Sequence, residues 1–236
     1  MNRAPIHLSI RNLNAFYGES HVLHGINLNV HQGEVVSILG RNGAGRTTLL
    51  RAVMGLMPRA SGRIMLQGAD ILGMPSHQIV RRGVGYCPEE RGIYASLTCL
   101  ENLMLPPRIA DTGMSEEEIA SLFPNLKERY ASPGTKLSGG EQQMLALARI
   151  FRTGARLLLL DEISEGLAPV IVQSLGNAVR QLKQKGFTVV LVEQNFRFSE
   201  RLADRFYVLE EGSVVAEFTR DELNARREEL SGLLGL

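Results

Sequence analysis

The chain has 236 residues, of which 22% are charged and 44% hydrophobic, and its formal net charge at pH 7 is +1. This length gives room for one large or two small domains with an ample core, and the near-neutral charge gives no sign of a nucleic-acid surface. The two cysteines, Cys87 and Cys99, are too few for a disulfide framework and lack the spacing of metal ligands, so we expect buried, reduced thiols.

No apolar run approaches the roughly 18 residues that a membrane-spanning helix needs, and the first residues lack the apolar core of a signal peptide. We therefore expect a cytosolic chain unless a partner brings it to a membrane. No Pro-, Gly- or Ser-rich break divides the sequence. A second domain would consequently be an insertion within the first rather than an appended module.

The chain begins with a pattern typical of strands. Ile6, Leu8 and Ile10 alternate with polar residues, and the same alternation returns over 26–30, which predicts two half-exposed antiparallel strands. Tyr17 is expected in the turn between them. Its flat ring could stack on a purine base, although an ordinary surface aromatic side chain is equally consistent with the sequence.

The stretch 35–50 predicts a buried parallel strand, a glycine-rich loop and the start of a helix. The glycines let successive backbone N–H groups point inward, and the positive end of the following helix favours a polyphosphate ligand. Thr47 would hold Mg²⁺, whereas a glycine-rich turn that binds nothing is the alternative for the loop alone. The candidate phosphate-binding residues are Gly40, Arg41, Asn42, Gly43, Ala44, Gly45, Arg46, Thr47 and Thr48.

One position departs from the P-loop pattern G-x-x-x-x-G-K-[ST]. Arg46 stands where the pattern has lysine. The positive charge is kept, but a guanidinium group is longer, planar and forked, whereas an ammonium group is a compact charge. The geometry of phosphate binding should therefore differ from that of an ordinary P-loop.

Beyond the loop we expect a helix over about 47–57, a strand over 63–66, a short helix over 75–82 and a buried strand over 84–87. Helical segments broken by proline and glycine fill 98–135, which suits a small helical insertion. Within it, Ser115 and Glu118 have capping-box spacing and mark a helix start.

The sequence LSGGEQQ at 137–143 opens the next helix, whose apolar residues recur at helical spacing. A turn formed by Ser138, Gly139, Gly140 and Glu141 therefore lies at a helix N-terminus, where it could bind a second anion. A flexible turn that only caps the helix is the alternative.

The four leucines at 157–160 predict another buried strand, which ends in Asp161 and Glu162. Acids at the carboxyl end of a parallel strand lie where such sheets hold ligands, although in isolation they are often merely solvated. Asp161 could hold Mg²⁺, and Glu162 could polarise a water molecule that attacks a γ-phosphate.

The remainder predicts a helix ending at Lys185, a buried strand over 188–192 and a hairpin of strands 206–209 and 214–218. Gln194 follows the buried strand as the polar side chain at its tip. The tail 221–236 alternates charge with leucine, which predicts an exposed amphipathic helix.

These motifs in this order resemble the ATP-binding subunits of ABC transporters over nearly the whole chain, and LSGGEQQ between a P-loop and LLLLDE is the most specific element. The resemblance implies an α/β P-loop NTPase with a parallel core sheet and an N-terminal antiparallel β-layer. It also implies a single ABC ATPase domain over 1–236, with a helical subdomain at 90–155 inserted within it.

The resemblance also implies the roles of individual residues. Tyr17 would stack on adenine, the loop 40–48 would wrap the phosphates, Asp161 would be the Mg²⁺-associated acid and Glu162 the catalytic base. The turn 138–141 would bind the γ-phosphate of ATP held by a second, head-to-tail ATPase subunit. Each composite site would then require a homodimer or heterodimer.

Three polar residues of the expected site differ from the usual family pattern. Arg46 replaces lysine, Glu89 replaces a glutamine that lines the active site near Mg²⁺ and the γ-phosphate, and Gln194 replaces a histidine that contacts the γ-phosphate. Ile163 also replaces a proline. Because the polar changes all belong to this chain's own P-loop half-site, we hypothesise that this half-site binds ATP more than it hydrolyses it. The alternative keeps Glu162 as a working base and Arg46 as an adequate phosphate clamp.

Within the family, the sequences CPEER, GLAP, LVEQN and SGLLGL resemble the branch that drives branched-chain amino-acid uptake. That resemblance implies ATP and Mg²⁺ as cofactors, a second ATPase subunit, two transmembrane permease subunits and, indirectly, a periplasmic or extracellular binding protein. It implies a peripheral location on the cytoplasmic face of the inner membrane and no nucleic-acid partner.

Other functions remain as alternatives. Exporters of sugar, lipid or lipopolysaccharide share the core motifs but usually carry histidine at the position of Gln194. A soluble ABC ATPase of DNA repair or translation would typically have paired cassettes or long inserted arms. A P-loop kinase or GTPase has no use for LSGGEQQ, and a purely structural module is favoured least.

Overall fold

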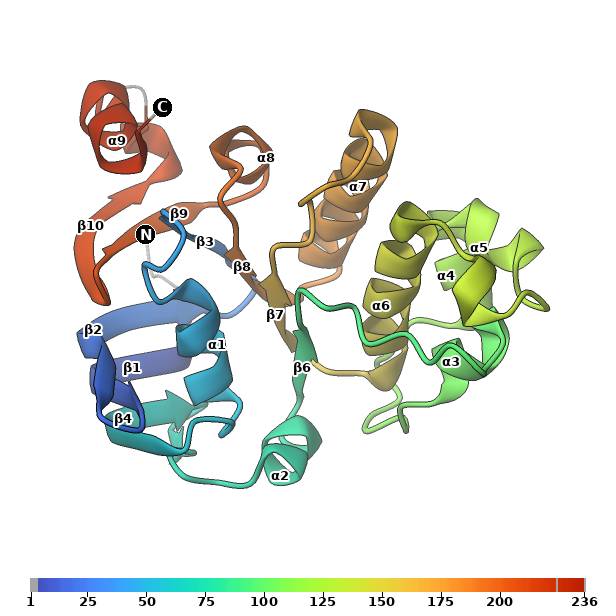
Figure 1. The fold of residues 1–236 in the computed structure, drawn as a ribbon, viewed down its shortest axis with the longest axis horizontal. Coiled ribbons are helices and arrows are strands. Elements are labelled where there is room, and N and C mark those ends of the chain that lie inside the picture. The colour runs from blue at the N-terminus through green and yellow to red at the C-terminus, as the bar shows by residue number, and fades with distance from the viewer. Residues whose placement is uncertain (1–3, 224, 236) are drawn as a thin grey trace.

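The computed structural model describes residues 4–223 and 225–235. Residues 1–3, 224 and 236 lie outside the described residues. They include both ends of the expected domain 1–236, and one interior residue and the last residue of the expected tail helix 221–236. The chain folds into two β-sheets with helices between and beside them (Figure 1). The strands are β1 (Ile6–Tyr17), β2 (Ser20–His31), β3 (Val35–Gly40), β4 (Arg59–Leu66), β5 (Ala69–Asp70), β6 (Val84–Cys87), β7 (Leu157–Asp161), β8 (Thr188–Val192), β9 (Arg205–Glu210) and β10 (Ser213–Thr219).

The helices fall between these strands or after them. They are α1 (Arg46–Val53), α2 (Ser76–Arg81), α3 (Cys99–Met104), α4 (Glu116–Leu122), α5 (Pro124–Glu128), α6 (Gly139–Thr153), α7 (Pro169–Gln184), α8 (Phe196–Glu200) and α9 (Arg227–Leu234), with short 3₁₀ turns at Gly134–Lys136 and Arg220–Glu222.

The larger sheet has six strands in the order β10-β9-β3-β8-β7-β6 and is parallel except for the β9–β10 pair. Alternate residues of its central strands face two separate cores. In β7, Leu157 and Leu159 belong to one core, whereas Leu158 and Leu160 belong to the other. Because both faces are covered, the central strands are continuous apolar runs. The predicted parallel core sheet is confirmed.

The smaller sheet is antiparallel, with the strand order β2-β1-β4-β5. It forms the predicted N-terminal β-layer. Leu49, Leu50 and Val53 of α1 share one core with residues of this sheet and with Val36 and Ile38 of β3. The helix that follows the glycine-rich loop is thus packed between both sheets, which holds the loop itself in place.

The predicted alternation is confirmed for 26–30 in β2 and for Leu8 and Ile10 in β1, but not at the start of β1. Ile6 is 44% exposed, whereas His7 is 4% exposed and its Nδ1 lies 2.7 Å from Thr188 Oγ1. A register shift between Ile6 and Leu8 exchanges the buried and exposed sides at this end of the strand, as an irregularity of the β-bulge type does. Tyr17 is the last residue of β1 rather than part of the turn.

The helices α3 to α6 come between β6 and β7 in the sequence and lie together beside the large sheet (Figure 1). Ser115 and Glu118 form the predicted capping box at the start of α4. Cys87 and Cys99 are free and buried, as predicted.

Some boundaries were predicted wrongly. Helix α1 ends at Val53, before the predicted end, and β4 starts at Arg59 because pairing with β1 extends it. The tail helix α9 is shorter than predicted and is not fully exposed, since Leu230 is 2% exposed and packs into the core beside the large sheet.

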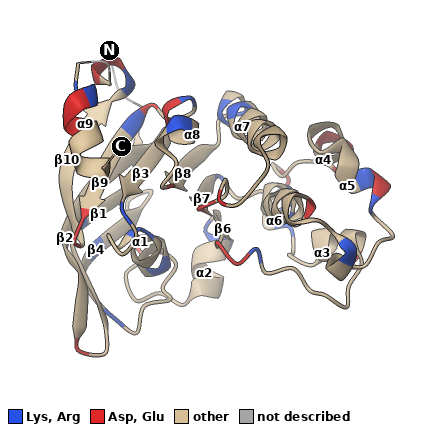
Figure 2. Ribbon diagram, turned by 45° about the horizontal axis from the view of Figure 1, so that its top comes forward, with Lys and Arg blue, Asp and Glu red and all other residues tan. Residues whose placement is uncertain are grey.

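No helix within the described parts of the chain combines the length and apolar character needed to cross a bilayer. Acidic and basic residues are interspersed over the helices on both sides of the large sheet (Figure 2).

We expect Gly85→Ala to lower the free energy of unfolding by about 1–3 kcal/mol, because overpacking a core has costs of this size. A Cβ at Gly85 would overlap Ile150 Cγ2 of α6 and lie 3.1 Å from Leu158 Cδ2. Chemical denaturation measures the change. The matched control is Gly232→Ala in α9, where the new Cβ meets nothing within 4 Å. Equal stability of the two variants would contradict this account of how α6 packs on β6.

Candidate functional site

The parallel register brings the ends of three strands to one edge of the large sheet. Ile38 of β3 pairs with Val192 of β8, and Val192 pairs with Asp161 of β7. The loops that leave these strands therefore start side by side, although the loop after β3 lies more than a hundred residues before the other two in sequence. These are the glycine-rich loop, the segment beginning at Glu162 and the segment beginning at Glu193.

The glycine-rich loop curls around a cavity of about 380 Å³. Gly43 and Gly45 have φ angles of 80° and 100°, in the left-handed region that favours glycine. Gly45 is also the N-cap of α1, whose positive end adjoins the cavity. The lining residues are Val22, Arg41, Asn42, Gly43, Ala44, Gly45, Arg46, Thr47, Thr48, Glu89, Glu162 and Glu165. Val22 and Glu165 belong to no motif in the sequence, and only the folding of the chain brings them to the cavity.

Arg46 forms an ion pair with Glu162 across this cavity. The Arg46 and Glu162 side chains are only 7% and 8% exposed. Arg46 Nε and Nη1 are buried and have no hydrogen-bond partner among the residues that the structure describes. Buried donors without partners are costly, and a phosphate oxygen would satisfy them with a charge-assisted bond. The chemistry of the cavity thus fits an anionic ligand.

Asp161 lies next to the loop through a hydrogen bond of 3.2 Å from Thr47 Oγ1 to its Oδ1. Tyr86 donates a second one, of 3.2 Å, to Asp161 Oδ2. Burial raises the pKa of Asp161 to about 6, against the lowering effect of these two bonds. Hydroxyl and carboxylate oxygens suit Mg²⁺, which commonly takes its other ligands from substrate phosphates and water. Within the described residues, no three His, Cys, Asp or Glu side chains cluster as a metal site.

Glu162 has a φ of 49°, which is unusual for a residue with a side chain and costs on the order of 1–3 kcal/mol. Its backbone N–H donates to Val192 O at 2.9 Å, and its Oε2 accepts from Gln194 N at 3.2 Å. The nearby Glu89 is exposed, and its pKa is raised by partial burial and then by the charges of Glu165 and Glu162.

Several residues singled out from the sequence do not line this cavity. Tyr17 is 39% exposed, and the Arg51 guanidinium lies 5.9 Å from its ring centroid. Gly40 ends β3 behind the loop, where a Cβ would overlap the carbonyl oxygen of Leu209. Gln194 is exposed and reaches the site through its backbone N–H.

The turn at the start of α6 is also absent from the lining of this cavity. Ser138 caps the helix, because its Oγ accepts from Glu141 N at 3.3 Å while Glu141 Oε2 accepts from Ser138 N at 2.7 Å. Ser138 and Gly139 are exposed, and Gly140 is buried against Ile171. One chain alone therefore does not bring this turn to its own glycine-rich loop.

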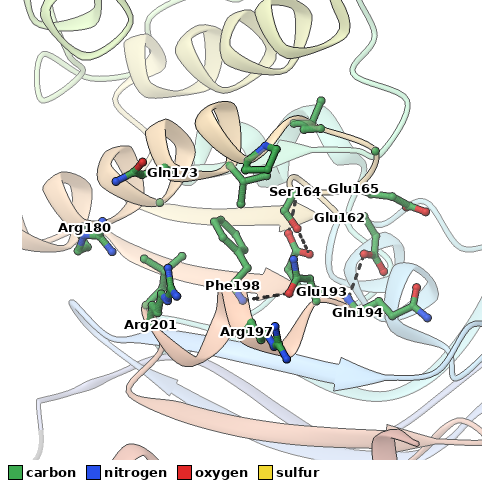
Figure 3. Close-up of a pocket in the computed structure, with 17 residues that line it drawn as sticks. Glu162, Ser164, Glu165, Gln173, Arg180, Glu193, Gln194, Arg197, Phe198 and Arg201 are labelled. Atoms are coloured by element: carbon green, nitrogen blue, oxygen red, sulfur yellow. Dashed lines mark hydrogen bonds between the residues drawn. The ribbon is translucent and has the colours of Figure 1, made fainter. Parts of the chain in front are cut away.

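A larger cavity of about 920 Å³ lies between α7 and α8 (Figure 3). It shares Glu162 and Glu165 with the cavity of the glycine-rich loop. Its wall also contains Ser164 and the buried Glu193, which sequence reasoning missed. The only signal was an acid placed directly after the apolar strand β8.

The fold and the site define an α/β P-loop nucleotide-binding protein. The family model described as ABC transporter matches residues 23–165. Over 215 residues the chain is 42% identical to the high-affinity branched-chain amino acid transport ATP-binding protein BraG of Pseudomonas aeruginosa, covering 90% of this chain and 92% of BraG. The chain thus belongs to the ABC transporter ATP-binding family.

Other relatives share this fold along their length. The lipopolysaccharide export system ATP-binding protein LptB of Escherichia coli K12 is 33% identical over 222 residues, which cover 92% of each chain. A solved structure of an ATP-binding subunit of an ABC transporter is 30% identical to this chain and has a TM-score of 0.79. The match covers 97% of this chain and 95% of the solved chain. An ATP-binding cassette solved as a dimer in a post-hydrolysis state with ADP and Pi has a TM-score of 0.78 at 23% identity, covering 90% of this chain and 98% of its own.

We expect Glu162→Ala to lower the free energy of unfolding by about 3 kcal/mol, because it leaves the buried charge of Arg46 without its partner. Saturating ADP should recover part of this loss. The matched control is Glu165→Ala, an exposed acid of the same cavity, for which we expect a change within about 0.5 kcal/mol. Denaturant titration with and without ADP measures both. A Glu162→Ala variant as stable as the Glu165→Ala variant would show that the ion pair contributes nothing.

Proposed function

We propose that the chain is the ATP-binding and ATP-hydrolysing subunit of a membrane ABC importer for branched-chain or related amino acids. The observation that carries this proposal is the meeting of the P-loop with Asp161 and Glu162 at one edge of the parallel sheet. The similarity to BraG supports the class of transported compound. The chain would lie peripherally on the cytoplasmic face of the inner membrane and bind two permease subunits and, through them, a secreted binding protein.

The phosphates of ATP would lie against the backbone N–H groups of 43–48, and Arg46 would donate its unpaired N–H groups to them. Thr47 and Asp161 would hold Mg²⁺, with Glu89 at the rim of the same cavity. The ion would neutralise charge that develops on the phosphate oxygens.

Glu162 would act as the base that accepts a proton from the attacking water, once its pairing with Arg46 has been released. Gln194 would hold Glu162 through its backbone N–H and offer its exposed amide to the γ-phosphate. Tyr17 would stack on adenine from outside the phosphate cavity, where its exposed ring is available.

A second ATPase subunit would complete each site. Ser138, Gly139, Gly140 and Glu141 of one subunit would face the γ-phosphate held by the P-loop of the other, which explains why they do not line their own chain's cavity. The related cassette solved as a dimer with ADP and Pi supports such an arrangement.

Transport would follow from closing and reopening of this dimer, and residues 90–155 would move as a helical subdomain within the single domain. A contact supports this coupling: Arg91 Nε donates to Gln143 Oε1 at 3.0 Å, and Arg149 donates to Arg91 O and Gly92 O. The loop beginning at Glu89 is thus tied to α6, whose first turn is Ser138–Glu141. A change at the γ-phosphate could pass along this path to residues 93–102 and the membrane subunits.

The P-loop site of this chain would hydrolyse ATP slowly, because one carboxylate oxygen of Glu162 is held in an ion pair with Arg46. Most turnover of the complex would then come from a partner's P-loop, completed by this chain's intact turn at 138–141. Export of lipopolysaccharide is the second candidate, supported by the 33% identity to LptB. Reconstitution with candidate permeases distinguishes the two, since import requires ATP-dependent uptake of an amino acid.

The asymmetric account predicts that Glu162→Gln leaves most of the ATP turnover of the reconstituted complex. The reason is that the partner's P-loop site keeps its own base. Steady-state phosphate release measures turnover. Near-complete loss in the Glu162→Gln complex would contradict the asymmetry and would assign most hydrolysis to this chain's P-loop.

Arg46→Lys should raise turnover at this chain's own site about tenfold, which corresponds to about 1.4 kcal/mol of barrier. A compact ammonium group would bind phosphate without occupying Glu162. Single-turnover hydrolysis by the purified chain measures this rate. An unchanged rate would show that the arginine is neutral.

A further inference from the structure

A buried acid links the two loops that leave β7 and β8. Glu193 is 1% exposed, and its Oε1 accepts a hydrogen bond of 3.0 Å from Ser164 N. Its Oε2 accepts another, of 2.7 Å, from Ser164 Oγ. Figure 3 shows this pair in the wall of the larger cavity, directly beside Glu162 and Gln194. One serine therefore satisfies both oxygens of an acid that solvent barely reaches.

A carboxyl group buried as deeply as that of Glu193 is costly, so we asked what it contributes. Burial disfavours the charged form and raises the pKa of Glu193 to about 8. An apolar side chain of similar size would fill the space without that cost. The hydrogen bonds to Ser164, which is itself 5% exposed, are what the acid adds to the structure.

The position of Ser164 matters because Glu162 lies two residues before it. The left-handed φ of Glu162 is maintained only if the surrounding structure holds the backbone on both sides. On one side, Glu162 N is bonded to Val192 O, and its carboxylate to Gln194 N. On the other side, the backbone N–H and the hydroxyl of Ser164 are fixed by Glu193. The segments 162–164 and 192–194 are thus joined by four hydrogen bonds.

We propose that Glu193 is a positioning residue for ATP hydrolysis, which acts through Ser164 to hold the strained backbone at Glu162 and to aim the Glu162 carboxylate. The same contact ties the orientation of this carboxylate to the segment that carries Gln194. Glu193 itself does not line the cavity of the glycine-rich loop. The inference rests on the proposed role of Glu162 as the base.

The test uses the purified chain without other ATPase subunits. Every P-loop in the sample then belongs to this chain, so the measured hydrolysis occurs at the site that contains Glu162. Single-turnover hydrolysis with excess protein gives the rate constant of the chemical step, and nucleotide titration gives the affinity separately. Glu193→Ala, which removes both hydrogen bonds to Ser164, should lower the rate constant by on the order of 10- to 100-fold, the effect of misplacing a catalytic group. Ser164→Ala keeps the backbone N–H bond to Glu193 Oε1 and loses only the hydroxyl bond, so it should lower the rate constant by a smaller factor. The affinity for ATP should change less than about threefold, because neither residue lines the P-loop cavity.

Two further variants separate positioning from general damage. Glu193→Gln should retain most of the rate, since its amide offers an acceptor to Ser164 N and a donor to Ser164 Oγ. Ser199→Ala is the matched control, because Ser199 Oγ is buried in α8 without a hydrogen-bond partner in the described chain, and its rate should stay at that of the wild type. The double variant Glu193→Ala/Ser164→Ala should be no slower than Glu193→Ala alone, since Glu193→Ala already removes both hydrogen bonds to Ser164.

A wild-type rate for Glu193→Ala would overturn the inference. So would a Glu193→Gln rate as low as that of Glu193→Ala, or a loss confined to ATP affinity. If Glu193→Ala fails to fold, Glu193→Leu replaces it, because leucine fills a similar space and also lacks both hydrogen bonds to Ser164. Glu162→Gln serves as the benchmark. If it also hydrolyses ATP at the wild-type rate, the proposed role of Glu162 fails and this inference fails with it. A slow Glu162→Gln beside fast Glu193→Ala and Ser164→Ala would overturn the inference alone.

Discussion

The register of β3, β8 and β7 is the constraint on which the site depends. Parallel pairing aligns Ile38, Val192 and Asp161, so that the segments that follow the three strands emerge at one edge. Both faces of this sheet are buried, and a slip by one residue would turn every apolar side chain toward the wrong core. The packing of the two cores therefore also fixes the position of the P-loop relative to Asp161 and Glu162. The geometry of the site at the edge of the sheet thus depends on side chains that lie far from it.

The edge itself is built from buried charges with few partners. Arg46 and Glu162 neutralise each other, yet two nitrogens of Arg46, Nε and Nη1, remain without acceptors in the described structure. An arginine at this position reaches farther than a lysine and holds the carboxylate with one arm of its fork. When Arg46 binds a phosphate, it would at the same time release the Glu162 carboxylate. This competition links the unusual P-loop residue to the slow own-site hydrolysis that we propose.

Much of the architecture could be predicted from the sequence, because buried parallel strands such as Leu157–Asp161 have an unmistakable apolar pattern. Thr47 and Asp161 were both expected near Mg²⁺ from their motifs, and the fold brings their side chains to within 3.2 Å of each other. The bulge that exposes Ile6 and the burial of Leu230 in α9 could not be predicted, since both arise from tertiary pairing and packing. The contacts of Glu162 with Arg46 and of Glu193 with Ser164 join segments distant in sequence, and residue types alone do not reveal such pairs.

The most direct test of the central claim is an experimental structure of the chain with Mg²⁺ and a non-hydrolysable ATP analogue. The account predicts phosphates against the backbone N–H groups of 43–48, with the Arg46 guanidinium turned from Glu162 to a phosphate oxygen. An analogue bound elsewhere, for example in the cavity between α7 and α8, with the ion pair between Arg46 and Glu162 intact, would contradict it.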